Sequence, residues 1–208
     1  YWLHNGFVNV DHTKMSKSLG NVVLVGDLLA NAPGEVVRLA LLNAHYRQPL
    51  DWSENILTEA RRKLDRLYNA LRNTHGWEDS WQEAQPDDAV VEALEDDLNT
   101  PRALAAMFGI AREINRLGDT PEAIAYARSL RASADLIGLL GSDPEQWFES
   151  DVGRAVNTAD IDALIQQRKE ARAARDFAAA DQIRDELTEM GVVIEDSADG
   201  TRWRYQND

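Results

Sequence analysis

The 208-residue chain is 44% hydrophobic and carries a formal net charge of −14. Its hydrophobic content suffices for a packed core and its length suits one or two domains, but no apolar run approaches the ~20 residues of a membrane span. The chain has no cysteine, which excludes disulfides and thiolate sites, and its four histidines are scattered, so we expect no metal site here and no membrane partner.

The N-terminal third predicts one strand followed by helices. The apolar run at residues 7–10 predicts a strand, and the lysine- and serine-rich segment after it, residues 14–18, predicts a loop. A nearly continuous apolar stretch predicts a buried helix from Gly34 to Tyr46. Residues 53–73 predict a long helix with Ser53 as its N-cap, because apolar residues recur there every three or four positions.

The middle of the chain predicts three more helices. Asp87 or Asp88 is the expected cap of the first. Thr100-Pro101 and Thr120-Pro121 repeat one helix-start pattern, a hydroxyl N-cap followed by proline at the first helical position. We expect the last of these helices to reach about Leu140. Short connections between the helices predict an antiparallel bundle.

After a connector at residues 142–159, the pattern predicts two helices and a hairpin. The first helix is expected from Ile161 to about Arg175, and Asp176 is the expected cap of the second, Phe177 to Met190. The hairpin strands are expected at residues 192–194 and 201–204. The expected fold class is therefore mainly α.

Lys14-Met15-Ser16-Lys17-Ser18 spells KMSKS and is identified as the second ATP-site signature of class I aminoacyl-tRNA synthetases. The flanking residues, Tyr1 to Val8 and Leu19-Gly20-Asn21, resemble the cysteinyl-tRNA synthetase family. Two lysines three positions apart would by themselves indicate only a solvated turn. The full pentapeptide after a strand favours a functional loop. The other signature of the class, HIGH, does not occur in these residues.

The resemblance implies a role for both lysines. Amino-acid activation expels pyrophosphate from ATP, so negative charge builds on the leaving phosphates. A lysine ammonium on its flexible stem can reach such phosphates as a point charge. We therefore expect Lys17 to contact ATP, which binds with Mg, and Lys14 to assist. Residues 14–18 would close over the triphosphate as a mobile loop.

The last fifty residues hold side chains that suit RNA. An overall negative charge argues against bulk attraction to nucleic acid, but the acid is concentrated at residues 76–150, with 16 acidic and 5 basic side chains. RNA bases are read by stacking on aromatic or guanidinium planes and by hydrogen bonds to their edges. From spacing alone the alternatives stay open. Asp181 and Arg184 form a routine helix-surface pair, Phe177 opens an apolar stripe that continues through Leu187, and Trp203 suits a core.

The run from Ala171 to Leu187, followed by Glu195-Asp196 and Gly200-Thr201-x-Trp203, looks like the anticodon-binding domain of bacterial cysteinyl-tRNA synthetases. His45-Tyr46-Arg47 and Asp96 to Pro101 are similar to further segments of the family, so the likeness spans the chain. It implies that this end reads the GCA anticodon of tRNA(Cys). The anticodon contacts expected from matching positions are Arg172, Phe177, Asp181, Arg184 and Asp196. Tryptophan also occurs in the family at position 177, and phenylalanine there keeps stacking but lacks the indole donor.

The resemblance also implies a domain plan. Residues 1–48 would be the end of a Rossmann-type catalytic domain with the start of a stem-contact region, 49–150 a helical-bundle tRNA-binding domain, and 151–208 a small helix–helix–hairpin anticodon domain. Family members use ATP and cysteine, act in the cytoplasm and are usually monomers. Their zinc ligands would lie outside this chain. We therefore expect this chain to be the C-terminal part of such a ligase. We also expect it to be inactive by itself, because it lacks the HIGH segment and the cysteine pocket.

Two other functions compete with this interpretation. A related cysteine ligase of mycothiol synthesis shares KMSKS but has no need of an anticodon reader. A non-catalytic tRNA-binding module would have no use for an ATP loop. For Asp96-Asp97, a solvated acidic face beside a helix cap is expected rather than a catalytic role.

Overall fold

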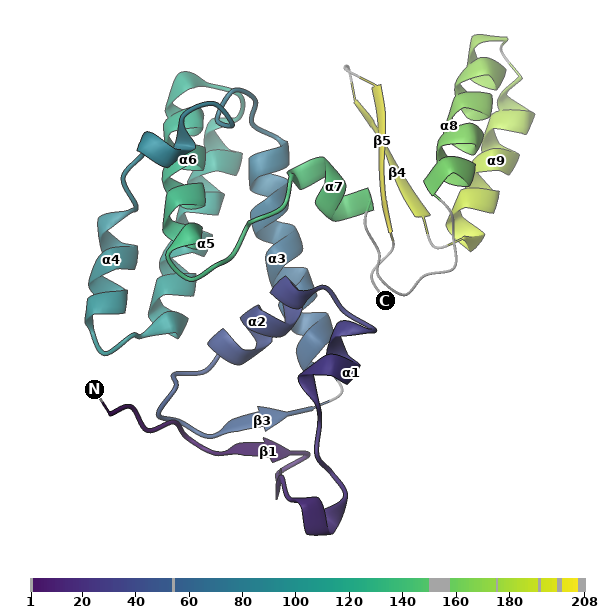
Figure 1. Cartoon of the computed structure of the whole chain (residues 1–208). Coiled ribbons are helices and arrows are strands. Elements are labelled where there is room, and N and C mark those ends of the chain that lie inside the picture. Colours follow the sequence, from purple (N-terminus) through teal and green to yellow (C-terminus); the bar gives the residue numbers. More distant parts are fainter. Residues whose placement is uncertain are drawn as a thin grey trace. The chain divides into compact units, whose positions relative to one another are not determined.

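The computed structural model describes residues 2–53, 55–149, 158–174, 176–190, 192–197 and 200–205. The chain divides into two compact units, Tyr1–Pro144 and Glu145–Asp208. Most of the described residues are helical (Figure 1), which confirms the mainly α class expected from the sequence. In this described part, no helix combines the length and the apolar character needed to cross a membrane.

The first unit begins with a three-stranded sheet in the order β2-β1-β3. The predicted strand is confirmed as β1 (Val8–Val10), which pairs antiparallel with β2 (Thr13–Lys14) and parallel with β3 (Leu50–Trp52). A parallel pair needs a crossover connection. Two helices provide it, α1 (Val25–Leu29) and α2 (Gly34–Leu42), and Figure 1 shows the two strands side by side beneath them.

The buried helix expected from Gly34 is confirmed, but it ends at Leu42 and not at Tyr46. The hydroxyl of Thr100 donates to the Leu42 carbonyl at 2.8 Å, which occupies a carbonyl at the end of the helix. The chain can then turn toward β3. Tyr46 consequently lies in a loop, where its side chain has another partner.

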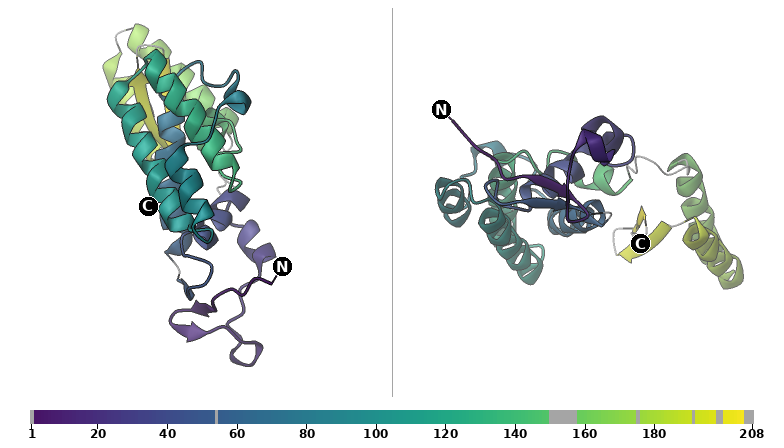
Figure 2. Two further views of the ribbon diagram at one scale, coloured as in Figure 1. Left: turned by 90° about the vertical axis from the view of Figure 1, so that its left-hand side faces the viewer. Right: turned by 90° about the horizontal axis from the view of Figure 1, so that it is seen from below.

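The rest of this unit is built chiefly from α3 (Ile56–Arg72), α4 (Asp88–Glu95), α5 (Thr100–Leu117) and α6 (Pro121–Asp135), and a short 3-10 helix, Trp81–Glu83, packs on α6. Helix α5 is central and packs on α3, α4 and α6, and the turned views show the long helices running beside one another (Figure 2). Their facing sides are apolar and buried. The core includes Leu64, Leu67, Tyr68, Leu71, Met107, Ile114 and Leu130.

The helix starts are partly as predicted. Asp87 accepts from the Ala89 N–H at 3.0 Å and Thr120 from the Ala123 N–H at 3.2 Å, so both are confirmed as N-caps. Thr100 was expected to cap α5 but is its first helical residue. The cap is Asn99, whose side chain accepts from the Arg102 N–H at 3.2 Å.

Two helix boundaries differ from the sequence analysis. Helix α3 begins after Asn55 rather than after Ser53. Helix α6 ends at Asp135, short of the predicted Leu140. The early end of α6 is explained by Gly138, whose φ of 68° is left-handed and lets the Leu139 N–H donate back to the Ala134 carbonyl at 2.9 Å. Beyond this end, Glu35 accepts from the Leu140 N–H at 2.6 Å and from the Tyr68 hydroxyl at 2.9 Å. Burial, together with the Glu35 carboxylate, raises the pKa of Tyr68.

The region after the bundle contains a helix that the sequence analysis placed in a connector, α7 (Pro144–Glu149). It is followed by α8 (Thr158–Ala173), α9 (Phe177–Glu189), β4 (Val192–Ser197) and β5 (Gly200–Tyr205). The predicted helix pair and hairpin are thus confirmed, although both strands are longer than predicted because their antiparallel pairing continues to Ser197 and Gly200.

The second unit has a small core of its own. Ile161, Leu187, Val192 and Trp203 are buried together, and the Trp203 indole N–H donates to Asp162 Oδ1 at 3.3 Å. The interpretation of Trp203 as a core residue is therefore confirmed. Asp176 accepts from the Ala179 N–H at 3.1 Å, which confirms it as the cap of α9.

Candidate functional site

The KMSKS residues form the passage from the sheet into a short 3-10 helix. Lys14 is the last residue of β2 and lies opposite Asn9 of β1. Lys17 begins the 3-10 helix, Lys17–Leu19, which ends at Gly20. Gly20 has φ of 68°, and its N–H donates to the Lys17 carbonyl at 3.2 Å. Glycine adopts this left-handed conformation without a steric penalty, so it suits the end of the loop.

Asn21 closes the loop from the other side. Its Oδ1 accepts from the Ser16 N–H at 2.9 Å, and its Nδ2 donates to the Lys14 carbonyl at 3.3 Å. The hydroxyls of Ser16 and Ser18 lie 3.2 Å apart. The residue type of Asn21 alone predicts no role, and the signal that points to it is its place in the family-like segment, directly after Leu19-Gly20.

Both lysines of the motif are exposed. The ammonium of Lys14 lies 5.6 Å from the centroid of the Phe7 ring, a cation–π distance. Two cationic groups thus project from a loop whose backbone is held by Asn21. This arrangement suits a polyphosphate, because flexible ammonium groups can follow charge that shifts between phosphates.

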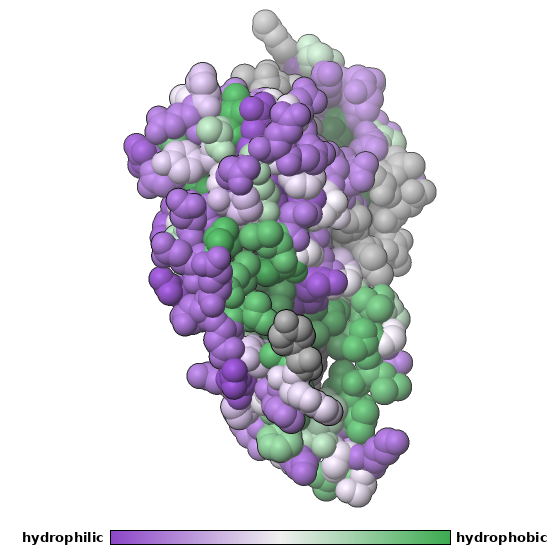
Figure 3. Space-filling view, turned by 60° about the vertical axis from the view of Figure 1, so that its left-hand side comes forward, coloured by the Kyte–Doolittle hydropathy of each residue, from purple (hydrophilic) through white to green (hydrophobic). Residues whose placement is uncertain are grey.

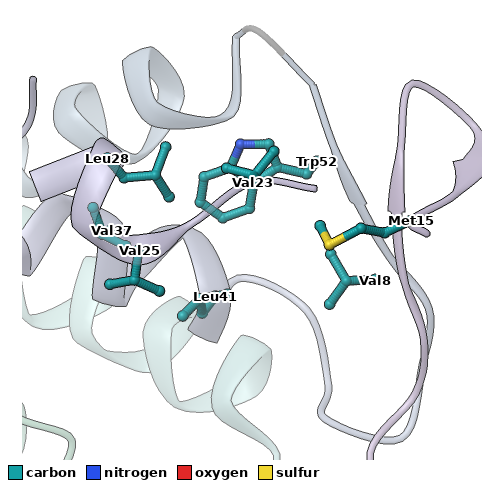
Figure 4. A pocket seen from close by; sticks show the side chains of 8 residues that line it. All are labelled: Val8, Met15, Val23, Val25, Leu28, Val37, Leu41 and Trp52. Carbon is teal, nitrogen blue, oxygen red and sulfur yellow. The ribbon is translucent and has the colours of Figure 1, made fainter. Parts of the chain in front are cut away.

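Met15, between the two lysines, faces an apolar pocket (Figure 4). The figure shows Met15 beside Val8 and reaching toward Trp52, with α1 and α2 side chains on the far side. The pocket is lined by Val8, Met15, Val23, Val25, Leu28, Val37, Leu41 and Trp52. Figure 3 shows that apolar side chains also reach the surface of the molecule, and Val25 and Leu41 are 56% and 45% exposed. Met15 therefore turns its side chain toward this apolar pocket, while the two lysines are exposed.

The hairpin that carries the loop is tied to β3. Asp11 and His12 form its turn with φ of 45° and 61°, the left-handed values that suit a two-residue hairpin connection. Asp51 Oδ1 accepts from the His12 N–H at 2.8 Å, and His12 Nδ1 lies 2.8 Å from Asp51 Oδ2. One carboxylate thus holds both the backbone and the side chain at the tip of the turn.

A second polar cluster joins the α4–α5 turn to residues 45–47. Arg47 Nε and Nη2 donate to the two carboxylate oxygens of Asp97 at 2.6 and 3.0 Å, and the Tyr46 hydroxyl donates to Oδ1 at 2.7 Å. The Arg47 hydrogen bonds, then that of Tyr46, lower the pKa of Asp97 to about 2. The pKa of Tyr46 is raised, chiefly by its hydrogen bond to this carboxylate.

The two neighbouring aspartates of this turn therefore differ. The side chain of Asp97 is 47% exposed, in line with the solvated face expected from the sequence, but both of its carboxylate oxygens also accept from Arg47. Asp96 fits that expectation better, since its side chain is 63% exposed and its nearest basic atom, on Arg102, is 3.7 Å away.

Four of the five expected anticodon residues lie on α8 and α9. Arg172 is near the end of α8, and Phe177, Asp181 and Arg184 are exposed on α9. The three α9 residues are four and three positions apart, so they share one helix face. The side chain of Asp196, in β4, lies outside the part that the structure describes.

Phe177 does not belong to the apolar stripe that the sequence analysis assigned to it. Its side chain is 64% exposed, whereas Ala180 and Leu187 are buried. The stripe that packs on the core is centred on Leu187, and position 177 lies about 80° around the helix from it at 100° per residue. An exposed ring is available for stacking.

Three family descriptions match the sequence in order. Residues 1–62 match the tRNA synthetases class I (C) catalytic domain, residues 89–141 the DALR domain, and residues 157–204 the cysteinyl-tRNA ligase anticodon binding domain. The first contains the KMSKS loop, and the last contains the exposed α9 face. The matches agree with the family-like motifs read from the sequence.

Curated relatives are similar over almost the whole chain. The cysteine–tRNA ligase of Parvibaculum lavamentivorans is 53% identical over 98% of this chain, and that of Rhodospirillum rubrum is 50% identical over 98%. In both cases the match covers 44% of the relative, so the chain spans less than half the length of these relatives. The chain belongs to the cysteinyl-tRNA synthetase family and corresponds to the C-terminal part of its members.

Proposed function

We propose that this chain provides the ATP loop and the tRNA-reading region of an ATP-dependent cysteine–tRNA ligase. The observation that carries the proposal is the KMSKS loop, in which hydrogen bonds of Asn21 hold the backbone and Met15 faces an apolar pocket while Lys14 and Lys17 are exposed. In the reaction, the carboxylate of cysteine attacks the α-phosphorus of ATP, which forms cysteinyl-adenylate and releases pyrophosphate. The cysteinyl group then passes to the 3′ end of tRNA(Cys), and AMP leaves.

The lysines act on the leaving group. As the bond to the α-phosphorus breaks, negative charge grows on the pyrophosphate, and an ammonium near it lowers the barrier. Lys17, at the start of the 3-10 helix, contacts the phosphates, and Lys14 assists from the end of β2. The Mg ion arrives with ATP and shares the neutralisation of the phosphate charge.

We propose no role for zinc at the described residues of this chain. A zinc site needs three or four His, Cys, Asp or Glu ligands within reach of one point. The chain has no cysteine, and across the residues with described placement no three such side chains come together. The zinc of the resembled family would therefore be held by residues other than those described. We further propose that the ligase is a cytoplasmic monomer.

The second unit is proposed to read the anticodon. The exposed ring of Phe177 offers a stacking surface, and Asp181 and Arg184 on the same face can hydrogen-bond base edges. Arg172 and Asp196 complete the set expected from the family. The match of residues 157–204 to an anticodon-binding domain favours tRNA over the amino-sugar substrate of a mycothiol-type ligase.

Two measurements test the proposal. The first titrates the 208-residue chain with a tRNA bearing the GCA anticodon and with the same tRNA carrying a changed anticodon, at about 50 and about 200 mM salt. We expect a preference for GCA that persists at the higher salt. Asp181→Asn should reduce the preference, and Glu186→Gln, a matched charge removal elsewhere on α9, should not. Binding without preference, abolished by salt, would contradict the anticodon assignment.

The second measurement follows cysteine-dependent exchange of pyrophosphate into ATP by the intact gene product. We expect exchange that requires cysteine and is not supported by serine. We also expect no cysteinyl-tRNA from the 208-residue chain alone, because it lacks the HIGH segment. An intact protein that exchanges nothing with cysteine would overturn the proposed ligase activity.

A further inference from the structure

The turn between α4 and α5 is held in a strained conformation. Asp97 and Leu98 both have φ of 54°, a left-handed value that residues other than glycine seldom adopt, and two in succession add strain. The Leu98 side chain is 51% exposed, so its burial does not hold the turn. Backbone hydrogen bonds within the turn hold it, among them that of the Leu98 N–H to the Leu94 carbonyl at 3.0 Å. Two side-chain contacts add to them: the Asp97 carboxylate with Arg47 and Tyr46, and the Thr100 hydroxyl with the Leu42 carbonyl.

The partners of Asp97 are joined directly to the sheet that carries the ATP loop. The Tyr46 carbonyl accepts from the Gly6 N–H at 2.6 Å, and the Leu50 N–H donates to the Phe7 carbonyl at 2.9 Å. From there the chain runs through β1 and the hairpin turn into β2, which ends at Lys14. Hydrogen bonds and strand pairing therefore connect Asp97 to the lysine loop without a gap.

This connection links two regions that match different family descriptions. Residues 45–47 lie within the segment similar to the catalytic domain, and Asp97 lies within the segment similar to the DALR domain. The Asp97 cluster is one of several polar ties between these segments, beside the Thr100–Leu42 hydrogen bond and the Glu35 carboxylate that accepts from the Leu140 N–H, and its pair with Arg47 depends on charge. A substitution at Asp97 should therefore weaken the hydrogen bonding of the sheet, although Asp97 is remote in sequence from Lys14.

We infer that Asp97 is a positioning residue for the ATP loop. Its carboxylate holds Tyr46 and Arg47, and thereby fixes the β1–β3 sheet, with Lys14 and Lys17 at its end, on the helical bundle. The expected effect on the reaction rests on the proposed ligase function, whereas the claim that Asp97 holds the sheet on the helical bundle does not. It differs from simple capping of a turn because it requires the negative charge.

Asparagine separates the two roles. It tolerates the left-handed conformation as aspartate does, so Asp97→Asn keeps the turn but removes the charge-assisted pair with Arg47. Asp97→Ala loses both the charge and the local preference for this conformation. Asp96→Asn is the matched control. It removes an equal charge at the neighbouring position, and the Asp96 side chain makes only a long contact, with Arg102.

The first test is amide hydrogen exchange of the 208-residue chain, read in peptides that cover residues 6–14 and 45–52. We expect Asp97→Asn to exchange about threefold faster or more in both segments, with unchanged exchange in α5, and Asp96→Asn to match the wild type. Arg47→Gln should act like Asp97→Asn, and the double variant should be no faster than either single variant. Wild-type exchange in Asp97→Asn, or additive effects in the double variant, would overturn the inference.

The second test measures pyrophosphate exchange by the intact gene product. Asp97→Asn should lower kcat about threefold or more, with the KM for cysteine unchanged and the fraction of active enzyme equal to that of the wild type. A loss of active fraction alone would indicate a merely structural role and overturn the inference. If the wild type shows no cysteine-dependent exchange, the proposed function fails, whereas the hydrogen-exchange result still decides whether Asp97 holds the sheet.

Discussion

Gly6 lies so close to the backbone of Gln48 that a Cβ at position 6 would stand 2.2 Å from the Gln48 carbonyl oxygen. The Gly6 N–H also donates to the Tyr46 carbonyl at 2.6 Å. The segment that enters β1 and the segment that enters β3 therefore meet with backbone against backbone. No side chain can move aside there, so only glycine allows the approach.

Replacing Gly6 by alanine should consequently destabilise the first unit. We expect Gly6→Ala to lower the free energy of unfolding by about 1–3 kcal/mol, the usual cost of forcing an extra carbon into a packed site. Gly26→Ala is the control, because a Cβ at Gly26 would meet no atom of the described residues within 4 Å and the residue lies in α1. It should leave the stability unchanged or raise it by up to about 1 kcal/mol. Urea denaturation of both variants tests this prediction. Equal denaturation midpoints for Gly6→Ala and Gly26→Ala would refute it.

Lys17→Ala should affect the chemical step rather than substrate binding. Removing one cationic group from the leaving phosphates should lower kcat for pyrophosphate exchange by about 100-fold or more, with the KM for cysteine nearly unchanged. Lys169→Ala is the control, because Lys169 is exposed on α8, outside the loop. Steady-state kinetics of the intact gene product provide the measurement. A wild-type kcat in Lys17→Ala would exclude this lysine from the reaction.

The Asp97 cluster predicts a defined pH range. The pKa of Asp97 lies at about 2, below its ordinary value of 3.8, mainly because Arg47 donates to the carboxylate. The pair therefore contributes its full stabilisation above pH ~5, where the group is charged even in the unfolded chain, and loses it progressively as the pH falls through 3.8 toward 2. Carbon NMR of the carboxylate should show no titration of Asp97 between pH 5 and 3. In Arg47→Gln, titration should appear in this range. A wild-type midpoint near 3.8 would contradict the assignment.

Phe177 and Trp203 should respond in opposite ways to truncation. Phe177→Ala should change stability by less than about 0.5 kcal/mol, because the ring is 64% exposed, and should weaken binding of the GCA tRNA by ~1–3 kcal/mol, the contribution of one stacked base. Trp203 is 5% exposed, so Trp203→Ala should cost about 3–5 kcal/mol of stability. Thermal denaturation and tRNA titration of each variant test this pair. Unfolding by Phe177→Ala would contradict the exposed placement of its ring.

The features predicted correctly from sequence depend on neighbours within a few residues. Asp87, Thr120 and Asp176 cap helices because each side chain accepts from an N–H two or three positions later. The same Thr-Pro pattern misled at Thr100, because its hydroxyl is engaged by the Leu42 carbonyl, 58 positions away. Local patterns carry no information about such distant partners.

The candidate site shows the same limit. The KMSKS motif identifies the lysines, and Asn21, which holds the loop backbone, follows it closely, but the residues that hold the hairpin and the sheet are distant in sequence. Asp51 reaches His12 from 39 positions away, in a three-residue strand too short to show alternation. Asp97 lies 50 positions from Arg47, in a run of acidic residues that reads as a solvated surface.

The pairing of β1 with β3 determines when the ATP loop can form during synthesis. Residues 14–18 are made before β3, which supplies the parallel partner of β1 and the Asp51 carboxylate that holds the hairpin turn. A hairpin with only two paired positions is marginal by itself, and pairing across the α1–α2 crossover is slow to form because distant segments must first meet. A nascent chain halted before Leu50 therefore carries the KMSKS sequence without its geometry, and the loop takes its shape only once Trp52 has left the ribosome.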